Sequence, residues 1–509
     1  MIRVALVAGL LLTGCSWKRE HVGFNLVSDS VQLDWNRVVD ASSVTVIDNL
    51  MEGLVTYSPA LQGSTPELLK PVPALARSWT ISDGGRRIRF HLRPGVKWSD
   101  GVALEARHFV DSWQRLLLPE TRADQAFHLF HLVGAQEFNK GWIKDFSRVG
   151  VRALDERTLE VELREPVPYF LHLLTTPSTF PVRKDLIERH GADWIHPDHL
   201  VTLGPYRLER LVPRERIELV RNPEYWGEEP AIRRVVARMV SEPSTALALY
   251  ESGELDILPR ELPPQRAAVL AGKPAFRSGP RLSTFFLMLN TRRAPFHRVE
   301  ARRAFAAAVD RAAMARHFYG AVSPATSLVP PGLAGYRKFT PAGVVALLRG
   351  QALDLRFSGS DTWNVAYQQL QKTLAEGAGA GVRLQRLEWR EFNEILASRR
   401  HPGHLLHFGW GADFPDAQSF LGIFVSGSKT NLTGWSSPAF DDLVSRYGRE
   451  TSEERRERLA VEAQEILVER EAVVVPLFHS SHQTLVREGL KGVALHPLDK
   501  WYFRSMRWE

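Results

Sequence analysis

The sequence predicts a mixed α/β protein of more than one domain, on three observations. The chain has 509 residues, which is too long for one ordinary hydrophobic core. Apolar residues make up 44% and charged residues 24%, a balance typical of globular chains. Segments with a two-residue apolar period alternate irregularly with segments of helical period. Together these observations indicate strands and helices interleaved in two or three domains.

The spacing of apolar residues places individual elements. Alternation over residues 87–92, 159–163 and 217–219 predicts strands with one buried face. The apolar run inside residues 284–290 is typical of a strand buried on both faces. Three- and four-residue spacing predicts helices, and such stripes lie at residues 109–117, 305–312, 440–447 and 459–467.

Residues typical of helix ends support several of these elements. Ser437-Pro438 offers an N-cap followed by proline at the first helical position. Thr451 and Glu454 have the spacing of a capping box. The glycine-rich run 377–381 follows a predicted helix and precedes a predicted strand. We therefore interpret it as a helix C-cap and turn, because a phosphate-binding loop has the opposite order.

The first fifteen residues are typical of a lipoprotein signal peptide. Arg3 precedes an apolar run, residues 4–12, which is too short to span a bilayer. The run ends in Leu12-Thr13-Gly14-Cys15, which resembles a bacterial lipobox, in which cleavage precedes a cysteine that is then lipidated. We expect an exported protein of the periplasm or cell envelope, anchored to the membrane through Cys15. The alternative is an ordinary buried cysteine behind a fortuitous apolar start.

Composition argues against several classes of function. Cys15 is the only cysteine, which excludes an intrachain disulfide and a CxxC zinc site. The formal net charge is +7, but 65 basic and 58 acidic residues are interspersed and basic runs are short. We therefore predict a solvated basic surface and no nucleic-acid partner.

The chain also lacks the common catalytic motifs. GxSxG, HExxH, GxxxxGK[ST] and GxGxxG are all absent. His401, His404 and His407 lie close together, but Pro402-Gly403 interrupts any helix between them. In a strand, residues 404 and 407 would point to opposite faces. We predict a protein that is not an enzyme and that holds no cofactor and no metal.

Eight groups of short motifs follow one another along most of the chain. They lie at residues 73–79, 90–101, 111–116, 165–170, 204–208, 215–226, 290–311 and 410–441. In this order they resemble the family 5 extracellular solute-binding proteins, the oligopeptide-binding components of bacterial ABC importers. Any one motif is weak, but the ordered series is specific. Trp410-Gly411-Ala412-Asp413 is most similar to the oligopeptide-binding members.

The resemblance implies a two-lobed, type II-like periplasmic-binding-protein clamshell with an extra inserted domain. The expected parts are the signal peptide (1–15), a discontinuous first lobe (22–70, 183–282 and 480–509), the inserted domain (71–182) and a second lobe (283–479). The ligand would lie between the lobes, and hinge closure would bury it.

The resemblance also implies a set of peptide-binding residues. They are Asp413, Trp410, Gly411, Trp389, His407, His401, Arg400, Asn431 and Glu52. Asp413 matches the residue that holds the peptide's α-ammonium, and Trp410 and Gly411 match the segment that pairs with its backbone. From spacing alone, Asp413 also fits a turn residue before Pro415.

The chain departs from the family at the carboxyl end of the expected ligand. His407 stands where the family has an arginine, and a neutral imidazole does not replace a permanent, forked guanidinium. Either His401 or Arg400 could supply the carboxylate partner instead. If His407 serves, only its imidazolium binds a carboxylate, so we predict affinity that weakens as pH rises from 5 to 8.

The expected function is capture of short peptides and their delivery to the transmembrane subunits of an ABC permease. The expected protein is a monomer, attached to the membrane by its lipid. Two alternatives stay open at this point. One is an exported hydrolase that acts on peptides. The other is a family relative that binds heme, nickel, a murein peptide or an oligosaccharide.

Overall fold

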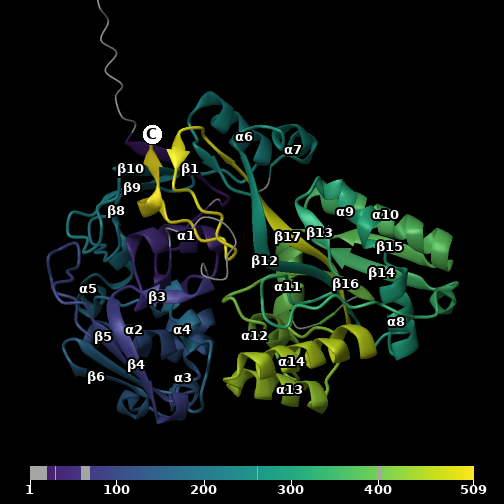
Figure 1. The fold of residues 1–509 in the computed structure, drawn as a ribbon, viewed down its shortest axis with the longest axis horizontal. Helices are drawn as coiled ribbons and strands as arrows, with labels where there is room; N and C mark the ends of the chain where they lie inside the picture. Colours follow the sequence, from purple (N-terminus) through teal and green to yellow (C-terminus); the bar gives the residue numbers. More distant parts are fainter. Residues whose placement is uncertain (1–19, 29, 59–68, 261, 399, 402) are drawn as a thin grey trace, which may run out of the picture.

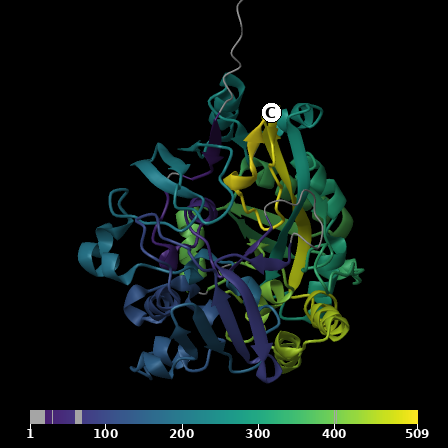
Figure 2. The same ribbon diagram turned by 60° about the vertical axis from the view of Figure 1, so that its left-hand side comes forward.

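The computed structural model describes residues 20–28, 30–58, 69–260, 262–398, 400–401 and 403–509. Cys15 and the rest of the predicted signal peptide lie outside these residues. The molecule has two lobes, joined where the long strands β12 (Phe276–Leu289) and β17 (Val474–Val486) cross between them (Figure 1). These two strands are antiparallel and lie side by side in both views (Figures 1 and 2).

A sheet of eleven strands runs through both lobes. Its order is β15-β14-β16-β12-β17-β11-β1-β10-β9-β8, with β13 beside β17. Its further strands are β1 (His21–Leu26), β8 (Tyr206–Val212), β9 (Arg216–Arg221), β10 (Arg234–Met239), β11 (Ile257–Leu258), β13 (Val322–Pro324), β14 (Ala352–Phe357), β15 (Gly381–Arg386) and β16 (Leu405–Gly411). β1 is parallel to β10 and β11, and β14 is parallel to β15 and β16. The sheet therefore contains both parallel and antiparallel strands, and helices connect many of them. This agrees with the predicted mixed α/β class.

The pairing of β12 with β17 is interrupted between Pro280 and Thr284. Within this interruption the Leu282 N–H donates to the Pro497 carbonyl at 2.9 Å, and its carbonyl accepts from the Ala412 N–H at 2.7 Å. A bulge of this kind bends a strand and re-aims its side chains. β12 therefore separates from β17 where the two strands cross between the lobes.

A second, four-stranded antiparallel sheet lies at one end of the molecule. Its order is β4-β5-β7-β6, and its strands are β4 (Ala76–Ser82), β5 (Arg87–Leu92), β6 (Val151–Asp155) and β7 (Thr158–Glu162). Ile88, Phe90 and Leu92 are buried on one face, as the alternation predicted. Helix α2 (Arg107–Leu117) buries the predicted stripe that includes Phe109 and Trp113. The whole sheet falls inside the range expected for the inserted domain.

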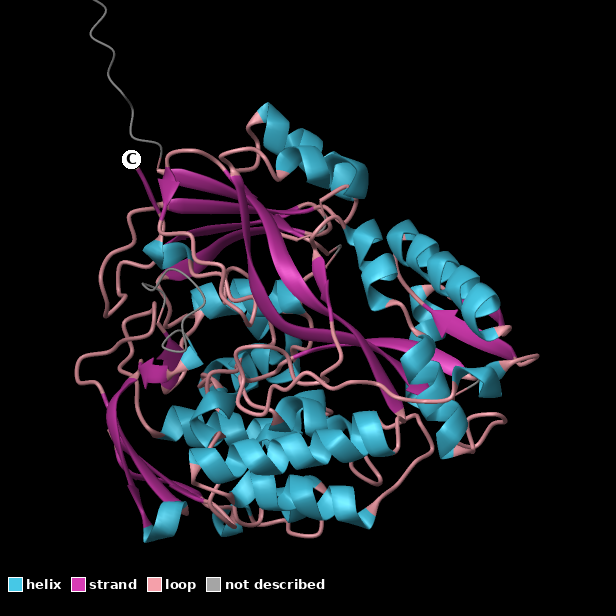
Figure 3. Cartoon of the chain, turned by 45° about the vertical axis from the view of Figure 1, so that its right-hand side comes forward, coloured by secondary structure: helices cyan, strands magenta, loops and turns pink. Residues whose placement is uncertain are grey.

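The remaining helices are spread over both lobes (Figure 3), and α3 and α5 lie near α2 and the four-stranded sheet (Figure 1). They are α1 (Ala41–Leu50), α3 (Ala135–Asn139), α4 (Phe170–Leu173), α5 (Lys184–His190), α6 (Pro243–Ser252), α7 (Pro264–Leu270), α8 (Val299–Ala308), α9 (Arg311–Ala315), α10 (Asp361–Ala378), α11 (Trp389–Ser398), α12 (Gln418–Leu421), α13 (Pro438–Arg449) and α14 (Glu453–Gln464). Two short ribbons complete the fold: β2 (Val55–Tyr57) pairs with β3 (Pro71–Pro73), and β18 (Leu490–Lys491) pairs with β19 (Arg507–Trp508). Within the described ranges, no helix combines the length and apolarity that a membrane crossing requires.

The second lobe has hydrophobic clusters on both faces of β12. Phe286 and Met288 belong to one cluster, and Leu287 and Leu289 belong to the other. All four side chains are fully buried. The predicted strand with two buried faces is therefore confirmed.

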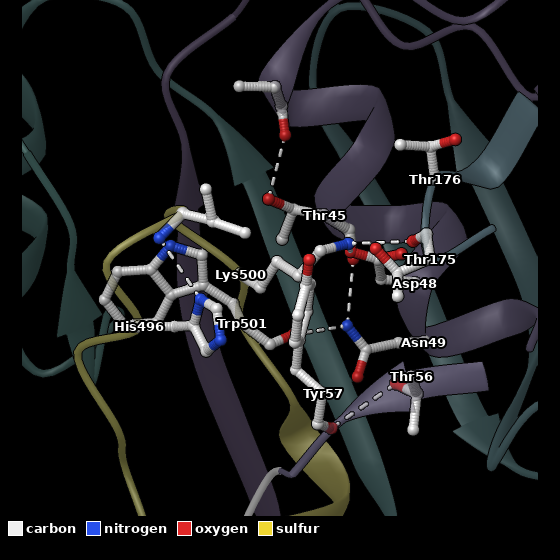
Figure 4. A network of polar contacts seen from close by, with 12 residues as sticks. Thr45, Asp48, Asn49, Thr56, Tyr57, Thr175, Thr176, His496, Lys500 and Trp501 are labelled. Carbon is white, nitrogen blue, oxygen red and sulfur yellow. Dashed lines mark hydrogen bonds and ion pairs between the residues drawn. The ribbon is translucent and has the colours of Figure 1, made fainter. Parts of the chain in front are cut away.

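A buried polar network ties the C-terminal segment to the first lobe (Figure 4). The Lys500 ammonium forms an ion pair with Asp48 of α1 at 2.8 Å and donates to the Thr175 carbonyl at 3.3 Å. The neighbouring Asn49 amide donates to the Trp501 carbonyl at 2.7 Å. Three segments far apart in sequence are joined here.

Candidate ligand-binding cleft

A cavity of about 730 Å³ lies beside the crossing strands. Pro243 of α6 and Ala267 of α7 line one side, and Trp363 of α10 and Phe392 of α11 line the other. Phe285, Phe318, Trp363, Phe392 and Phe408 form an aromatic part of its wall, and the polar lining includes Arg260, Arg281, Ser358, Ser360, His407, Ser480, His482 and Gln483. A concave, largely apolar site with a few polar groups is typical of a ligand pocket.

Strands β12 and β16 form part of the cavity wall. Phe285 of β12 pairs with Gly409 of β16, and Leu287 pairs with His407. The Phe285 ring lies over Gly409, where an added Cβ would come within 2.6 Å of ring atoms. Glycine is therefore needed at 409 for the ring to lie flat against the strand.

Beyond the cavity, β16 ends within the motif Trp410-Gly411-Ala412-Asp413. Trp410 is half-buried and stacks on Phe408, with ring centroids 6.2 Å apart and an interplanar angle of 18°. Gly411 is exposed, and a Cβ built there would have no protein atom within 4 Å. β14 pairs with β16 only as far as Leu406, so the edge of β16 at Gly411 that faces away from β12 has no strand partner among the described residues. Backbone pairing with an extended ligand requires such an edge.

Asp413 follows at the end of this segment and lies next to a contact between the lobes. Phe414 is buried and stacks on Tyr169, with ring centroids 5.0 Å apart and an interplanar angle of 12°. The Asp413 backbone N–H donates to the Ser419 hydroxyl at 3.0 Å. These contacts hold the carboxyl group at the place where the two lobes meet.

The Asp413 carboxyl group has no arginine or lysine partner among the described residues. The residue is exposed to solvent, but nearby protein removes part of the hydration of the carboxylate, and this desolvation raises its pKa to about 6. A cation brought into the cleft would favour the ionised form. Asp413 is therefore suited to receive a ligand ammonium group.

This shift predicts a pH dependence of ligand binding. An ammonium pairs with the ionised carboxylate, so binding below pH 6 requires Asp413 to release its proton. Affinity is expected to fall by up to about tenfold per pH unit below pH 6 and to be nearly constant from pH 6.5 to 7. Calorimetric titration of a tripeptide from pH 4.5 to 7 measures this. An Asp413→Asn variant should lose the slope, and an unchanged slope in that variant would rule out Asp413 as its source.

The structure corrects the pH dependence that was predicted from His407. Its ring is buried against Trp363, with centroids 4.1 Å apart, and against Phe285 at 5.8 Å. Burial lowers the pKa of His407 to about 3, and a hydrogen bond to the Ser358 backbone offsets only part of this. His407 lines the cavity as a neutral ring from pH 5 to 8. The prediction of affinity that weakens over this range is therefore wrong.

The other two candidates for a carboxylate partner do not line the cavity. His401 is largely enclosed, its Nε2 contacts the Met288 carbonyl at 3.0 Å, and burial lowers its pKa to about 4. Arg400 is exposed. Trp389 is the first residue of α11, and its side chain lies outside what the structure describes.

Glu52 is occupied by contacts inside the protein. It accepts hydrogen bonds from Tyr225 and from Trp226, each at 2.8 Å, and it forms a buried ion pair with Arg504. These partners satisfy both carboxylate oxygens. Glu52 therefore stabilises the first lobe.

Asn431 is occupied in the same way. Its amide donates to the carbonyls of Phe424 at 3.0 Å and Trp435 at 3.1 Å, and its oxygen accepts from the Thr433 hydroxyl at 2.6 Å. Neither Asn431 nor Glu52 is among the residues that line the cavity. The structure gives both of them internal roles.

Two cavity residues, Arg260 and Arg281, were missed from the sequence. Arg281 lies in β12 within the interruption of its pairing with β17, so strand parity did not place its side chain. Arg260 lies in a connection after β11, and no local pattern distinguishes it from the other arginines. Among the described residues, no cluster of three or more histidine, cysteine or acidic side chains is arranged to hold a metal ion.

Comparison with known proteins agrees with this arrangement. The family described as "Bacterial extracellular solute-binding proteins, family 5 Middle" matches residues 70–431. The chain belongs to this family. The family 5 chain is 31% identical to the "Probable deoxycholate-binding periplasmic protein YgiS" of Escherichia coli, covering 95% of this chain and 92% of that protein. It is also 31% identical to the "Periplasmic oligopeptide-binding protein OppA" of Escherichia coli, over 94% and 91% of the two chains.

A solved structure shows the same fold. The family 5 chain superposes on Haemophilus influenzae OppA, in its complex with the peptide RPPGFSPFR, with a TM-score of 0.82 at 25% identity. The match covers 96% of this chain and 99% of that one. The predicted two-lobed clamshell of the periplasmic-binding-protein type is therefore confirmed. The relatives named here are extracytoplasmic binding proteins.

Proposed function

We propose that this family 5 protein captures short peptides in the cleft and delivers them to the transmembrane subunits of an ABC permease. The observation that carries the proposal is Asp413, an ionisable carboxyl group without a cationic partner among the described residues. Its place at the lobe contact suits the α-ammonium of a peptide, because closure strengthens such a charge pair.

The neighbouring backbone supports peptides over other ammonium ligands. Gly411 is exposed at the end of β16, and the cavity beside this strand has space for side chains. Backbone pairing holds an extended peptide whatever its sequence, and a roomy cavity tolerates different side chains. This combination serves a receptor for many peptides.

A second candidate ligand is an amphipathic acid that carries no ammonium group. The aromatic cavity wall favours it, and one relative at 31% identity is described as probably binding deoxycholate. Such a ligand would use the apolar wall and leave Asp413 unpaired. The role of Asp413 therefore distinguishes the two candidates.

Calorimetry with three ligands tests the proposal. The peptide Ala-Ala-Phe is expected to bind, its N-acetylated form to bind at least about 30-fold more weakly, and deoxycholate to bind more weakly than the peptide. Loss of the ammonium in the acetylated form leaves Asp413 without a cationic partner when the lobes close on the ligand. Equal binding of both peptides, or binding of deoxycholate alone, would overturn the proposal.

We further propose that Cys15 carries a lipid anchor in the cell envelope and that the protein works as a monomer without enzymatic activity. The lobe boundaries expected from the resemblance belong to the same proposal: 22–70, 183–282 and 480–509 against 283–479, with 71–182 inserted. Mass spectrometry of the N-terminal peptide is expected to show an acylated Cys15 and no residues before it. Release of a Cys15→Ser variant from the membrane fraction would support the anchor.

A further inference from the structure

Phe414 packs into a hydrophobic cluster far from its neighbours in the chain. Its ring stacks on Tyr169, and each of the two residues is only 5% exposed. Both belong to the large cluster of the first lobe, whereas Ala417 and Phe420, a few residues after Phe414, belong to a cluster of the second lobe. Among the described residues from 283 to 479, Phe414 alone joins the first-lobe cluster. Its side chain therefore crosses from one lobe to the other.

The turn that carries Phe414 is fixed to two helices of the second lobe. The Asp416 carboxylate accepts a hydrogen bond from the Tyr447 hydroxyl of α13 at 2.8 Å and forms a buried ion pair with Arg456 of α14. The Arg456 guanidinium lies over the Tyr447 ring, 4.1 Å from its centroid. The Asp416 N–H donates to the Phe414 carbonyl at 2.8 Å. Because a satisfied buried network of this kind is rigid, Phe414 moves with the second lobe.

Tyr169, which directly precedes α4, forms the receiving surface on the other side. The His131 ring packs edge-on against the tyrosine ring, with centroids 5.6 Å apart. A Cβ built on Gly448 of α13 would lie 3.8 Å from the Tyr169 hydroxyl oxygen, so α13 also comes close to this side chain. Stacked aromatic rings stabilise a contact beyond the area that they bury. The contact between the lobes therefore has a dry aromatic centre.

A charged pair lies at the rim of this contact. Arg449, the last residue of α13, lies 3.4 Å from Glu165, four residues before Tyr169. Both side chains are about half exposed, and exposed pairs of this kind contribute little free energy. The aromatic stack is therefore the main source of stability at this contact.

The aromatic stack is joined directly to the candidate ammonium-binding residue. Asp413 precedes Phe414 in the chain, and its N–H is held by the Ser419 hydroxyl in the same turn. Separation of the lobes would withdraw Phe414 from Tyr169 and expose both rings to water, which is unfavourable in proportion to the area exposed. It would also carry Asp413 away from the first lobe. The packing of Phe414 and the position of Asp413 thus change together.

We propose that Phe414 and Tyr169 are positioning residues that hold the lobes together around the ligand and keep Asp413 in place for its ammonium group. The inference rests on the proposed function. It gives the part of the chain around Tyr169, which falls inside the expected inserted domain, a role in ligand retention. Neither ring touches the ligand: both act on binding through the stability of the contact between the lobes.

The test measures binding and release of Ala-Ala-Phe by calorimetry and by stopped-flow tryptophan fluorescence. Phe414→Ala is expected to bind the peptide about 10- to 100-fold more weakly, which is the effect of losing one buried phenyl contact. Most of the loss should lie in faster dissociation, and the association rate should stay within about threefold of wild type. Small-angle X-ray scattering should show a smaller peptide-induced decrease in the radius of gyration of the variant.

A double-mutant cycle ties the effect to the contact itself. Tyr169→Ala should reproduce the loss seen in Phe414→Ala, and the double variant should bind no more than about threefold more weakly than either single variant. If Phe414→Ala does not fold, Phe414→Leu carries the test, with an expected loss of about 3- to 10-fold.

Two control variants remove neighbouring groups and leave the stack intact. Trp142→Ala removes a ring that is 72% exposed and packs under Lys140, and it should bind the peptide within about twofold of wild type. Glu165→Gln breaks the exposed rim pair, and it should also stay within about twofold.

The outcomes separate this inference from the proposed function. If the wild-type protein binds no peptide, the proposed function fails. If the wild type binds but Phe414→Ala and Tyr169→Ala release the peptide at the wild-type rate, peptide capture stands and the role of the stack is overturned. Fully additive losses in the double variant would overturn it as well, because the two rings would then act independently.

Discussion

Replacing Asp413 with asparagine is expected to weaken binding of Ala-Ala-Phe at pH 7 by at least about 30-fold. Truncating one partner of a desolvated charge pair costs about 2–5 kcal/mol, because the other charge then stays buried without compensation. Asparagine keeps the size of the side chain and removes its charge. Calorimetric titration of the purified variant measures the effect.

The matched control for this variant is Asp442→Asn. Asp442 lies on α13 with its side chain 62% exposed, and it pairs with Arg446 four residues later. Exposed pairs of this kind contribute little, so binding should stay within about twofold of wild type. Wild-type affinity in Asp413→Asn would show that Asp413 does not bind the ammonium group of the ligand.

Replacing Lys500 with methionine is expected to lower the free energy of unfolding by about 3–5 kcal/mol. Lys500 and Asp48 are 9% and 4% exposed, so the variant leaves a buried carboxylate without its cation. The free energy lost is the cost of that uncompensated charge. Urea unfolding, followed by tryptophan fluorescence, measures the change.

Two further variants make this stability result specific. The double variant D48L/K500M removes both charges and should recover most of the loss, because an apolar pair of similar volume often replaces a buried ion pair. Lys491→Met removes an exposed lysine that pairs with Glu509, and it should change the free energy of unfolding by less than about 1 kcal/mol. Equal effects of Lys491→Met and Lys500→Met would show that burial of the Lys500–Asp48 pair does not increase the cost of losing the lysine.

Local sequence patterns predicted many elements correctly because the residues that decide them are neighbours. Ser437 caps α13 as expected, since its side chain accepts from the Phe440 N–H. Gly379, at a φ of 63°, ends α10 inside the glycine-rich run. These features depend on hydrogen bonds and backbone conformations within a few residues, so the residues that form them are recognisable as a short pattern in the sequence.

Two local predictions were wrong, each because a helix boundary falls at another residue than the pattern indicated. The stripe over residues 305–312 is not one helix: α8 ends at Ala308, and Asp310 caps the new helix α9 through the Ala313 N–H. The capping box at Thr451 is also wrong, because Ser452 occupies the N-cap position of α14.

The site was harder to predict because its chemistry depends on partners far away in the sequence. Glu52 resembled a cleft residue, but Arg504 joins it across 452 positions and turns it into a structural group. Asp499 orients Arg281 across 218 positions. The pKa of His407 is decided by its packing against Trp363 of α10. Motif order identified the fold and made Asp413 a candidate, whereas these pairings appear only in three dimensions.

Native mass spectrometry of the protein, purified without unfolding, tests whether it captures peptides. A clamshell that closes on peptides is expected to retain a fraction of them, so the spectrum should show added masses that unfolding releases as short peptides with free amino termini. Asp413→Asn should lose these masses. A released molecule that is not a peptide, or no peptide adduct even after incubation with a mixture of tripeptides, would contradict peptide capture.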